Sequence, residues 1–231
     1  MMKKLTALVM LLVMALCCCT AQADETMKKI QQHTDVKIDV LEKYGFTTTY
    51  YDDFLFTAEL APQKDTITCA SNNPKNYPDE YTIQMDIRVV GSGTQCVLFP
   101  RLIFKRTGST VYYDDRMATV YIRNGENRYS VDVSDCSRSS KSNQYGGGTA
   151  TDSSVKVLRA DGISMLQDIA NSNNTVHLKF DYYGGSDITL SAENKKALTN
   201  FYNACLEAGI FEQEALFAIQ DDYSIITLFN K

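Results

Sequence analysis

A tetrapeptide that occurs twice carries the acidic side chains whose type and spacing could support chemistry. The sequence Tyr-Tyr-Asp-Asp stands at residues 50–53 and again at 112–115. Paired carboxylates on a turn offer hard oxygen ligands to calcium, and two carboxylates at a suitable separation can serve a glycosidase as acid and base. In the simpler interpretation, each Asp pair ends a strand or begins a turn. The candidate acidic site consists of Asp52, Asp53, Asp114 and Asp115.

Tyrosines form a second candidate surface. The chain has 14 tyrosines and no tryptophan, and a third tyrosine pair is followed by two glycines at 182–185. An exposed tyrosine offers a large apolar area with a polar tip, which suits contact with a sugar ring or a protein partner. Packing at strand edges accounts for these residues equally well. The candidate binding surface consists of Tyr112, Tyr113, Tyr145, Tyr182 and Tyr183.

Groups that assist catalysis or bind metal are sparse in this sequence. Only His33 and His177 are histidines, and no nucleotide-binding, metalloprotease or serine-hydrolase motif is present. No Cys-x-x-Cys pair and no calcium loop of the D-x-D-x-D-G type occurs, so we expect no cofactor, with calcium at the paired aspartates as the alternative. The sequence favours a non-enzymatic binding or interaction protein. A secreted glycosidase-type hydrolase and a structural envelope protein are the alternatives.

Charge narrows the class of partner. Lys and Arg number 23 against 28 Asp and Glu, which gives a net charge of −5. An acidic chain repels the phosphate backbone of nucleic acid and an anionic membrane surface. We therefore expect a macromolecular or carbohydrate ligand and no nucleic acid.

The first 23 residues resemble an export signal. Lys3 and Lys4 precede an apolar run from Leu5 to Cys19, and Ala21-Gln22-Ala23 fits a cleavage site. The run of 15 residues is shorter than the ~18 expected of a spanning helix. We expect cleavage after Ala23 and a secreted, periplasmic or cell-surface protein. Because Leu16-Cys17-Cys18-Cys19 resembles a lipobox, lipidation at Cys19 is the alternative that would anchor the chain to a membrane.

Four cysteines remain after the expected cleavage. An even number in an oxidising compartment favours two disulfides over a cysteine nucleophile paired with His177. If the strands between residues 81 and 133 form a simple meander, Cys69 and Cys136 lie at one end of the sheet and Cys96 at the other. A disulfide cannot span a strand length, so we expect the pairs Cys69–Cys136 and Cys96–Cys205.

The elements that must position these residues follow from periodicity. Apolar and polar residues alternate over 81–89, 118–123 and 129–133, and 96–105 is a more apolar run, which predicts strands. Asn124-Gly125 predicts a hairpin. The serine- and glycine-rich segment 134–154 predicts a loop that could display a binding surface.

The last third of the chain predicts helices as well as strands. Leu198, Phe201, Tyr202 and Cys205 have helical spacing after Ser191, which predicts a helix from Ser191 to Ala208. The expected fold is α+β: a mainly antiparallel β-sheet, meander or sandwich, with one or two C-terminal helices packed on one face. The expected organisation is a signal peptide (1–23), a helical or extended segment packed on the domain (24–65), and a single α+β domain (66–231).

Overall fold

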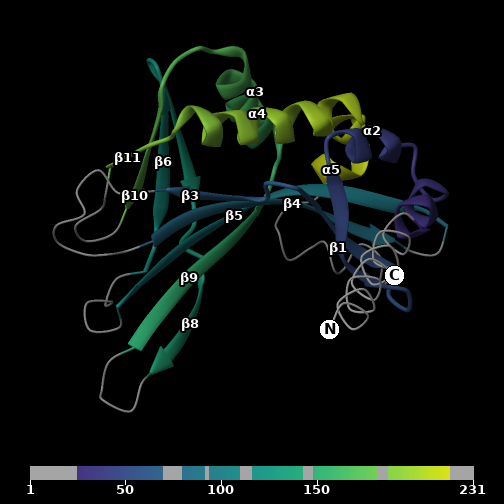
Figure 1. The fold of residues 1–231 in the computed structure, drawn as a ribbon, viewed down its shortest axis with the longest axis horizontal. Helices are drawn as coiled ribbons and strands as arrows, with labels where there is room; N and C mark the ends of the chain where they lie inside the picture. Colours follow the sequence, from purple (N-terminus) through teal and green to yellow (C-terminus); the bar gives the residue numbers. More distant parts are fainter. Residues whose placement is uncertain are drawn as a thin grey trace, which may run out of the picture.

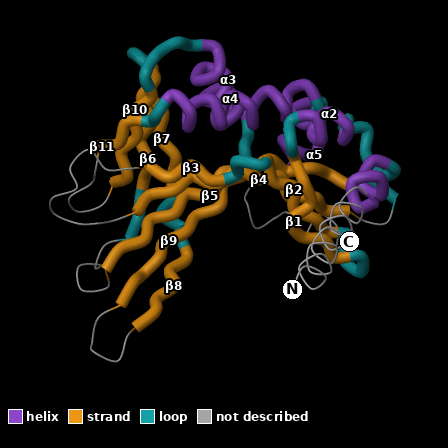
Figure 2. The backbone as a smooth tube through the Cα atoms, in the orientation of Figure 1, coloured by secondary structure: helices purple, strands orange, loops and turns teal. Residues whose placement is uncertain are grey.

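The computed structural model describes residues 25–69, 80–91, 94–109, 116–142, 148–181 and 187–218. Within these ranges the chain forms two antiparallel sheets with helices α3 and α4 lying along one side of them (Figure 1). Figure 2 shows these helices grouped over the sheets, whose strands run in different directions. The predicted α+β fold, mainly β, is confirmed.

The larger sheet has the strand order β1-β2-β4-β5-β9-β8, with β3 also paired to β4. Its strands are β1 (Phe46–Asp52), β2 (Thr57–Pro62), β3 (Thr66–Cys69), β4 (Glu80–Gly91), β5 (Cys96–Ser109), β8 (Ser137–Ser142) and β9 (Gly148–Val157). The smaller sheet has the order β11-β10-β6-β7. Its strands are β6 (Thr119–Asn124), β7 (Asn127–Asp132), β10 (Val176–Asp181) and β11 (Asp187–Thr189).

The helices lie near both ends of the described part of the chain and between the strands of its last third. They are α2 (Ile38–Lys43), α3 (Ala160–Asn171), α4 (Ala192–Glu207), the short 3-10 helix η2 (Ile210–Glu212) and α5 (Glu214–Ala218), and residues 25–31 are helical too. In the part of the chain that is described, no helix has the length and apolar character needed to cross a bilayer. Strands β1 and β2, from the segment 24–65, join β4 in the larger sheet, and the domain boundaries stay a prediction.

Helix α4 begins and ends as its sequence predicts. The Ser191 hydroxyl accepts a hydrogen bond from the Asn194 backbone N–H at 3.1 Å, which satisfies one of the free donors of the first turn. Gly209 follows the helix with a φ of 81°, a left-handed conformation that glycine adopts without steric cost. The stripe that holds Phe201 and Cys205 is buried, so the predicted packing face is confirmed.

An aromatic contact joins the two sheets. Tyr81 of β4 and Phe180 of β10 are fully buried, and their ring centroids lie 4.8 Å apart. Phe104 of β5 meets the same Phe180 ring edge-on at 6.5 Å. These rings belong to one core cluster that also takes in the buried faces of α3 and α4. The larger sheet, the smaller sheet and the helices therefore share a single core.

The simple meander predicted for the middle strands is wrong. β4 and β5 pair over their length as expected, but β6 and β7 leave to form the smaller sheet, and β5 pairs with β9 instead. The hairpin after Asn124 is confirmed, with Gly125 at a φ of 63°. Strand pairing is a long-range choice, and alternation alone does not say which strands become neighbours.

The loop predicted over 134–154 is also wrong where the structure describes it. Residues 137–142 and 148–154 belong to the paired strands β8 and β9. Their polar side chains are satisfied across the sheet: Arg138 Nε donates to the fully buried Asp152 at 2.7 Å, and the hydroxyls of Thr107 and Thr151 lie 2.9 Å apart. A strand can therefore be built from residues whose composition is typical of a loop when their polar groups pair with one another.

Asp168 ties α3 to the hairpin of the smaller sheet. Its carboxylate accepts hydrogen bonds from Asn124 Nδ2 at 2.8 Å, Asn127 Nδ2 at 3.0 Å and the Tyr129 hydroxyl at 2.9 Å. Burial opposes ionisation of Asp168, but these hydrogen bonds and the positive charge of Lys195 outweigh it and lower its pKa below the ordinary value.

Replacing Asp168 should destabilise the fold in a pH-dependent way. We expect Asp168→Ala to lower the free energy of unfolding by about 3 kcal/mol at neutral pH, because charge-assisted hydrogen bonds are lost. Since the folded pKa is lowered, this stabilisation is present above the unfolded pKa, about 4, and is lost as pH falls through the folded value. Urea denaturation at pH 7 and pH 3 measures the difference. The exposed neighbour Gln167→Ala is the control, and an equal loss at both pH values would contradict the role of the charge.

Candidate functional site

All five candidate tyrosines and two of the four candidate aspartates lie outside the described residues. This set consists of Tyr112, Tyr113, Asp114, Asp115, Tyr145, Tyr182 and Tyr183. Their roles, and the meeting of the two Asp pairs in one site, stay predictions. The other Asp pair, Asp52 and Asp53, is described.

Asp52 and Asp53 lie at the turn between β1 and β2. The Asp52 carboxylate accepts hydrogen bonds from the backbone N–H groups of Phe54 at 3.0 Å and Leu55 at 3.1 Å. Asp53 Oδ1 accepts a hydrogen bond from the Tyr51 hydroxyl oxygen, 2.6 Å away. The same carboxylate lies 3.5 Å from Lys29 Nζ. The hydrogen bond from Tyr51 and the charge of Lys29 lower the pKa of Asp53, so it is ionised at neutral pH. Asp52 thus shapes the turn, and Asp53 is a paired surface anion.

The turn has a strained residue that points inward. Phe56 has a φ of 45°, which a bulky side chain rarely adopts. Its ring meets His33 edge-on at a centroid distance of 4.8 Å and packs so closely on Gly91 that an added Cβ there would lie 2.2 Å from Phe56 Cδ1. The Phe56 carbonyl also accepts a hydrogen bond from the Gly91 N–H at 3.0 Å. Strain of this kind persists only where surrounding contacts hold it, and it concentrates at functional sites.

Two large apolar side chains project from the same turn. Phe54 is 95% exposed and Leu55 is 59% exposed. Because the Asp52 carboxylate binds both of their backbone amides and Phe56 anchors the far side, the backbone of the turn is held in place and both side chains project from it. We call residues 52–56 the finger.

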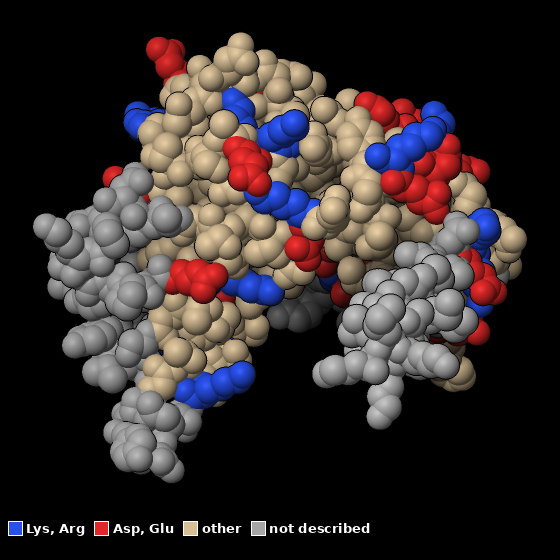
Figure 3. Space-filling view, viewed as in Figure 1, with Lys and Arg blue, Asp and Glu red and all other residues tan. Residues whose placement is uncertain are grey.

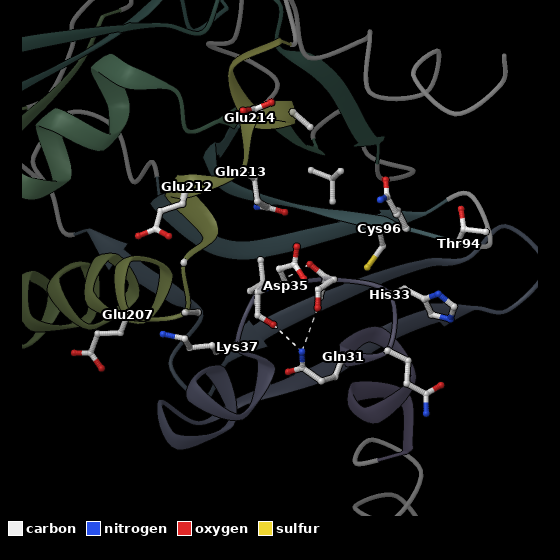
Figure 4. A pocket seen from close by; sticks show the side chains of 18 of the residues that line it. Gln31, His33, Asp35, Lys37, Thr94, Cys96, Glu207, Glu212, Gln213 and Glu214 are labelled. Carbon is white, nitrogen blue, oxygen red and sulfur yellow. Dashed lines mark hydrogen bonds between the residues drawn. The ribbon is translucent and has the colours of Figure 1, made fainter.

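A polar cleft of about 860 Å³ lies beside the finger (Figure 4). Residues 31–37, 94–97, 206–209 and 212–215 line it. His33 belongs to both features, since it lines the cleft and contacts Phe56 of the finger. The cleft therefore brings together three segments that are distant in the sequence, 31–37, 94–97 and 206–215.

Two glutamine side chains hold the walls of the polar cleft. Gln31 accepts from the Ile38 N–H at 2.8 Å and donates to two backbone carbonyls of its own loop. Gln213 accepts from the Leu98 N–H at 3.0 Å and donates to the Leu98 carbonyl at 2.9 Å, so it serves as a short strand partner for β5. Because the loop is also tied by the bond from Lys37 N to the Ala208 carbonyl, at 2.9 Å, the cleft is preformed.

The charged residues that line the polar cleft are mainly acidic. Asp35, Glu207, Glu212 and Glu214 are acidic and Lys37 is basic, and the other residues that line the cleft are uncharged or His33. Figure 3 shows acidic side chains gathered around α2 and the end of α4, with basic ones among them. Such a lining repels anions and offers many hydrogen-bond acceptors.

The four cysteines of the described residues are buried free thiols, so the predicted disulfides Cys69–Cys136 and Cys96–Cys205 are not formed in this structure. The pairing assumed a meander, and the departure of β6 and β7 to the smaller sheet removes that premise. The thiols of Cys69, Cys96 and Cys136 each lie 3.6 to 3.9 Å from a backbone carbonyl, and Cys205 is enclosed by α4 packing.

None of these thiols is activated as a nucleophile. Burial raises the pKa of Cys69 and Cys96 to about 12 and raises that of Cys136 and Cys205 as well. His177 lies on β10, 3.3 Å from the Thr189 hydroxyl. Within the described ranges, no group of three or more His, Cys, Asp and Glu side chains is placed to hold a metal ion.

Comparisons of the chain with models of protein families, with curated proteins and with solved structures find no match. The function is therefore inferred from the chemistry of the surface. The sequence predicted Asp52 and Asp53 of the finger as candidate site residues. The exposed apolar residues beside them, Phe54 and Leu55, were not predicted. The run Asp-Asp-Phe-Leu-Phe at 52–56 is the local pattern that could have indicated them, because two acidic turn residues lead directly into three large apolar ones.

Alkylation should find four thiols in a protein that comprises residues 24–231. In urea without reductant we expect iodoacetamide to modify all four cysteines, because none is bonded to another. In the folded protein at pH 8 the reaction should be slow, because burial keeps the thiols protonated. Intact mass spectrometry counts the adducts. Labelling of two or fewer cysteines in urea would restore the disulfide prediction.

The close contact between Phe56 and Gly91 should make the fold sensitive to any side chain added at position 91. We expect Gly91→Ala to lower the free energy of unfolding by about 2 kcal/mol, because its Cβ would overlap the Phe56 ring. In the double variant with Phe56→Ala the overlap is gone, so the two losses should fall short of additivity by about 1 kcal/mol or more. Urea denaturation of the four proteins gives this coupling, and strictly additive losses would contradict the contact.

Proposed function

We propose that this protein works outside the cytoplasm as a binding and interaction module, and that the finger is its contact with a protein partner. The observation that carries the proposal is the outward display of Phe54 and Leu55, 95% and 59% exposed, on a turn fixed by Asp52 and Phe56. Apolar side chains of this size on a tip gain free energy when they enter an apolar socket.

Rigidity favours the finger as a binding element. Association costs the entropy of every loop and side chain that becomes ordered, and a turn already held by hydrogen bonds has less to lose. Aromatic side chains that fill a pocket supply much of the binding energy at protein interfaces. Around them, the ionised Asp53 and its partner Lys29 supply a polar rim of the kind that surrounds such anchors.

The acidic groups of the finger favour a protein partner over a lipid surface. Asp52 and Asp53 follow one another directly before Phe54, so inserting the tip would bring two carboxylates to the lipid headgroups. Anionic lipids repel these charges, and the chain as a whole is acidic. The export motif at residues 1–23 supports the proposal that this contact is made in an extracytoplasmic space, with cleavage after Ala23, or with lipidation at Cys19 as the alternative.

Site-specific photo-crosslinking tests the finger. A benzophenone amino acid replaces Phe54 in the full chain, expressed in its own cell, and is irradiated there. We expect one discrete protein adduct, because the side chain would lie inside the partner's socket. The same group at the exposed position of Gln167 on α3 is the control and should give no such adduct.

A second variant separates a specific socket from chance proximity. With the crosslinker kept at position 54, Leu55→Ser removes half of the apolar tip and leaves the hydrogen bond to its N–H intact. We expect the adduct yield to fall several-fold. Absence of any protein adduct at position 54, or crosslinking to lipid alone, would refute the proposed function.

A further inference from the structure

The smaller sheet ends in an exposed edge strand. In the described part of the chain, β7 pairs with β6 and with no other strand. Its residues Ser130 and Asp132 are exposed, so the edge is open to solvent. An open edge offers a row of backbone N–H and C=O groups to any extended chain that reaches it.

The hydrogen-bond register shows which backbone groups of β7 are free to pair. Val133 N donates to the Ala118 carbonyl at 2.9 Å, and bonding alternates residue by residue along an antiparallel pair. Val131 and Tyr129 therefore also bond toward β6. Ser130 and Asp132 turn their backbone N–H and C=O groups the other way, out of the sheet.

An apolar cleft lies along this edge. Its volume is about 520 Å³, and Ser130, Val131 and Asp132 form one wall. The floor consists of core side chains that are each at most 3% exposed, Leu102 and Phe104 of β5 and Met165 of α3, and the half-buried Val131 lies beside it. A volume of this size with an apolar lining is typical of sites that hold a ligand.

Two of the charged groups at the rim, Lys156 and Asp135, form an ion pair. Lys156 Nζ lies 2.7 Å from Asp135, which also accepts the Ser154 hydroxyl proton at 2.7 Å. Asp132 accepts hydrogen bonds from the Ser134 hydroxyl and N–H, and these bonds lower its pKa. Because Asp132 is ionised, an acidic side chain placed beside it would be repelled.

We propose that the cleft binds an extended peptide segment, which adds a strand to the free edge of β7. The outward backbone groups of Ser130 and Asp132 pair with the peptide backbone. Every second peptide side chain is apolar and enters the cleft beside Val131, above the floor of Leu102, Phe104 and Met165, and acidic side chains are disfavoured near Asp132. Backbone pairing of this kind supplies affinity, and the side-chain floor supplies selectivity. This site is separate from the finger, since it uses a different sheet and different residues.

A displayed library of random hexapeptides, selected on the full chain, is the probe. The variant Ser130→Pro removes the outward N–H, and proline is tolerated on an edge strand because that N–H does not bond to β6. Ser130→Ala keeps the N–H and is the matched control. We expect enriched peptides to bind Ser130→Pro at least ten-fold more weakly than Ser130→Ala in fluorescence polarisation.

Methylation of the peptide backbone provides a readout that needs no variant. In an extended strand alternate amides face β7, so one set of alternating N-methyl groups should abolish binding to the unaltered protein and the other set should be tolerated. This keeps the proposal testable if Ser130→Pro does not fold. Equal affinities of the two variants, tolerance of both methylation patterns, or recovery of no peptide from the library would overturn the proposal.

Discussion

The contact of Phe180 with Tyr81 and Phe104 is the constraint on which the rest of the structure depends. Two sheets whose strands run in different directions cannot merge into one, so they must share a core where they meet. The three buried rings provide that meeting point, and α3 and α4 complete the same core. Because the sheets diverge from this point, β7 is an edge strand in the described part of the chain, and a cleft lies beside it.

Local sequence patterns predicted the helices and strands far better than they predicted which strands pair with one another. Alternation found β4 and β6, the pair Asn124-Gly125 found the hairpin, and the spacing after Ser191 found α4. Each of these depends on neighbouring residues. The second neighbour of β5 is β9 and not β6 as the meander predicted. That pairing depends on contacts between residues about fifty positions apart, which periodicity does not encode. The disulfide prediction failed for the same reason, since it inherited the assumed strand order.

Among the surface features too, those that depend on neighbouring residues could be predicted, and those that depend on long-range contacts could not. The Asp pair of the finger was visible in the sequence, whereas the strained φ of Phe56 arises from its packing against Gly91 and His33. The polar cleft depends on Gln213 reaching Leu98 across 115 residues, and no local motif reports such a bond. The composition of β8 and β9 is that of a loop, and polar pairs across the sheet, such as Arg138 with the buried Asp152 and Thr107 with Thr151, explain why they form strands.

The four enclosed thiols bear on how long the folded protein lasts. In the oxidising compartment that the proposed export implies, they stay protonated and out of reach as long as the core is closed, and folding requires no disulfide between them. Once a molecule opens, the same thiols become reactive together and can be joined wrongly within or between chains. Unfolding then becomes irreversible. The rate of unfolding, rather than the free energy of unfolding, therefore determines how long the protein stays folded.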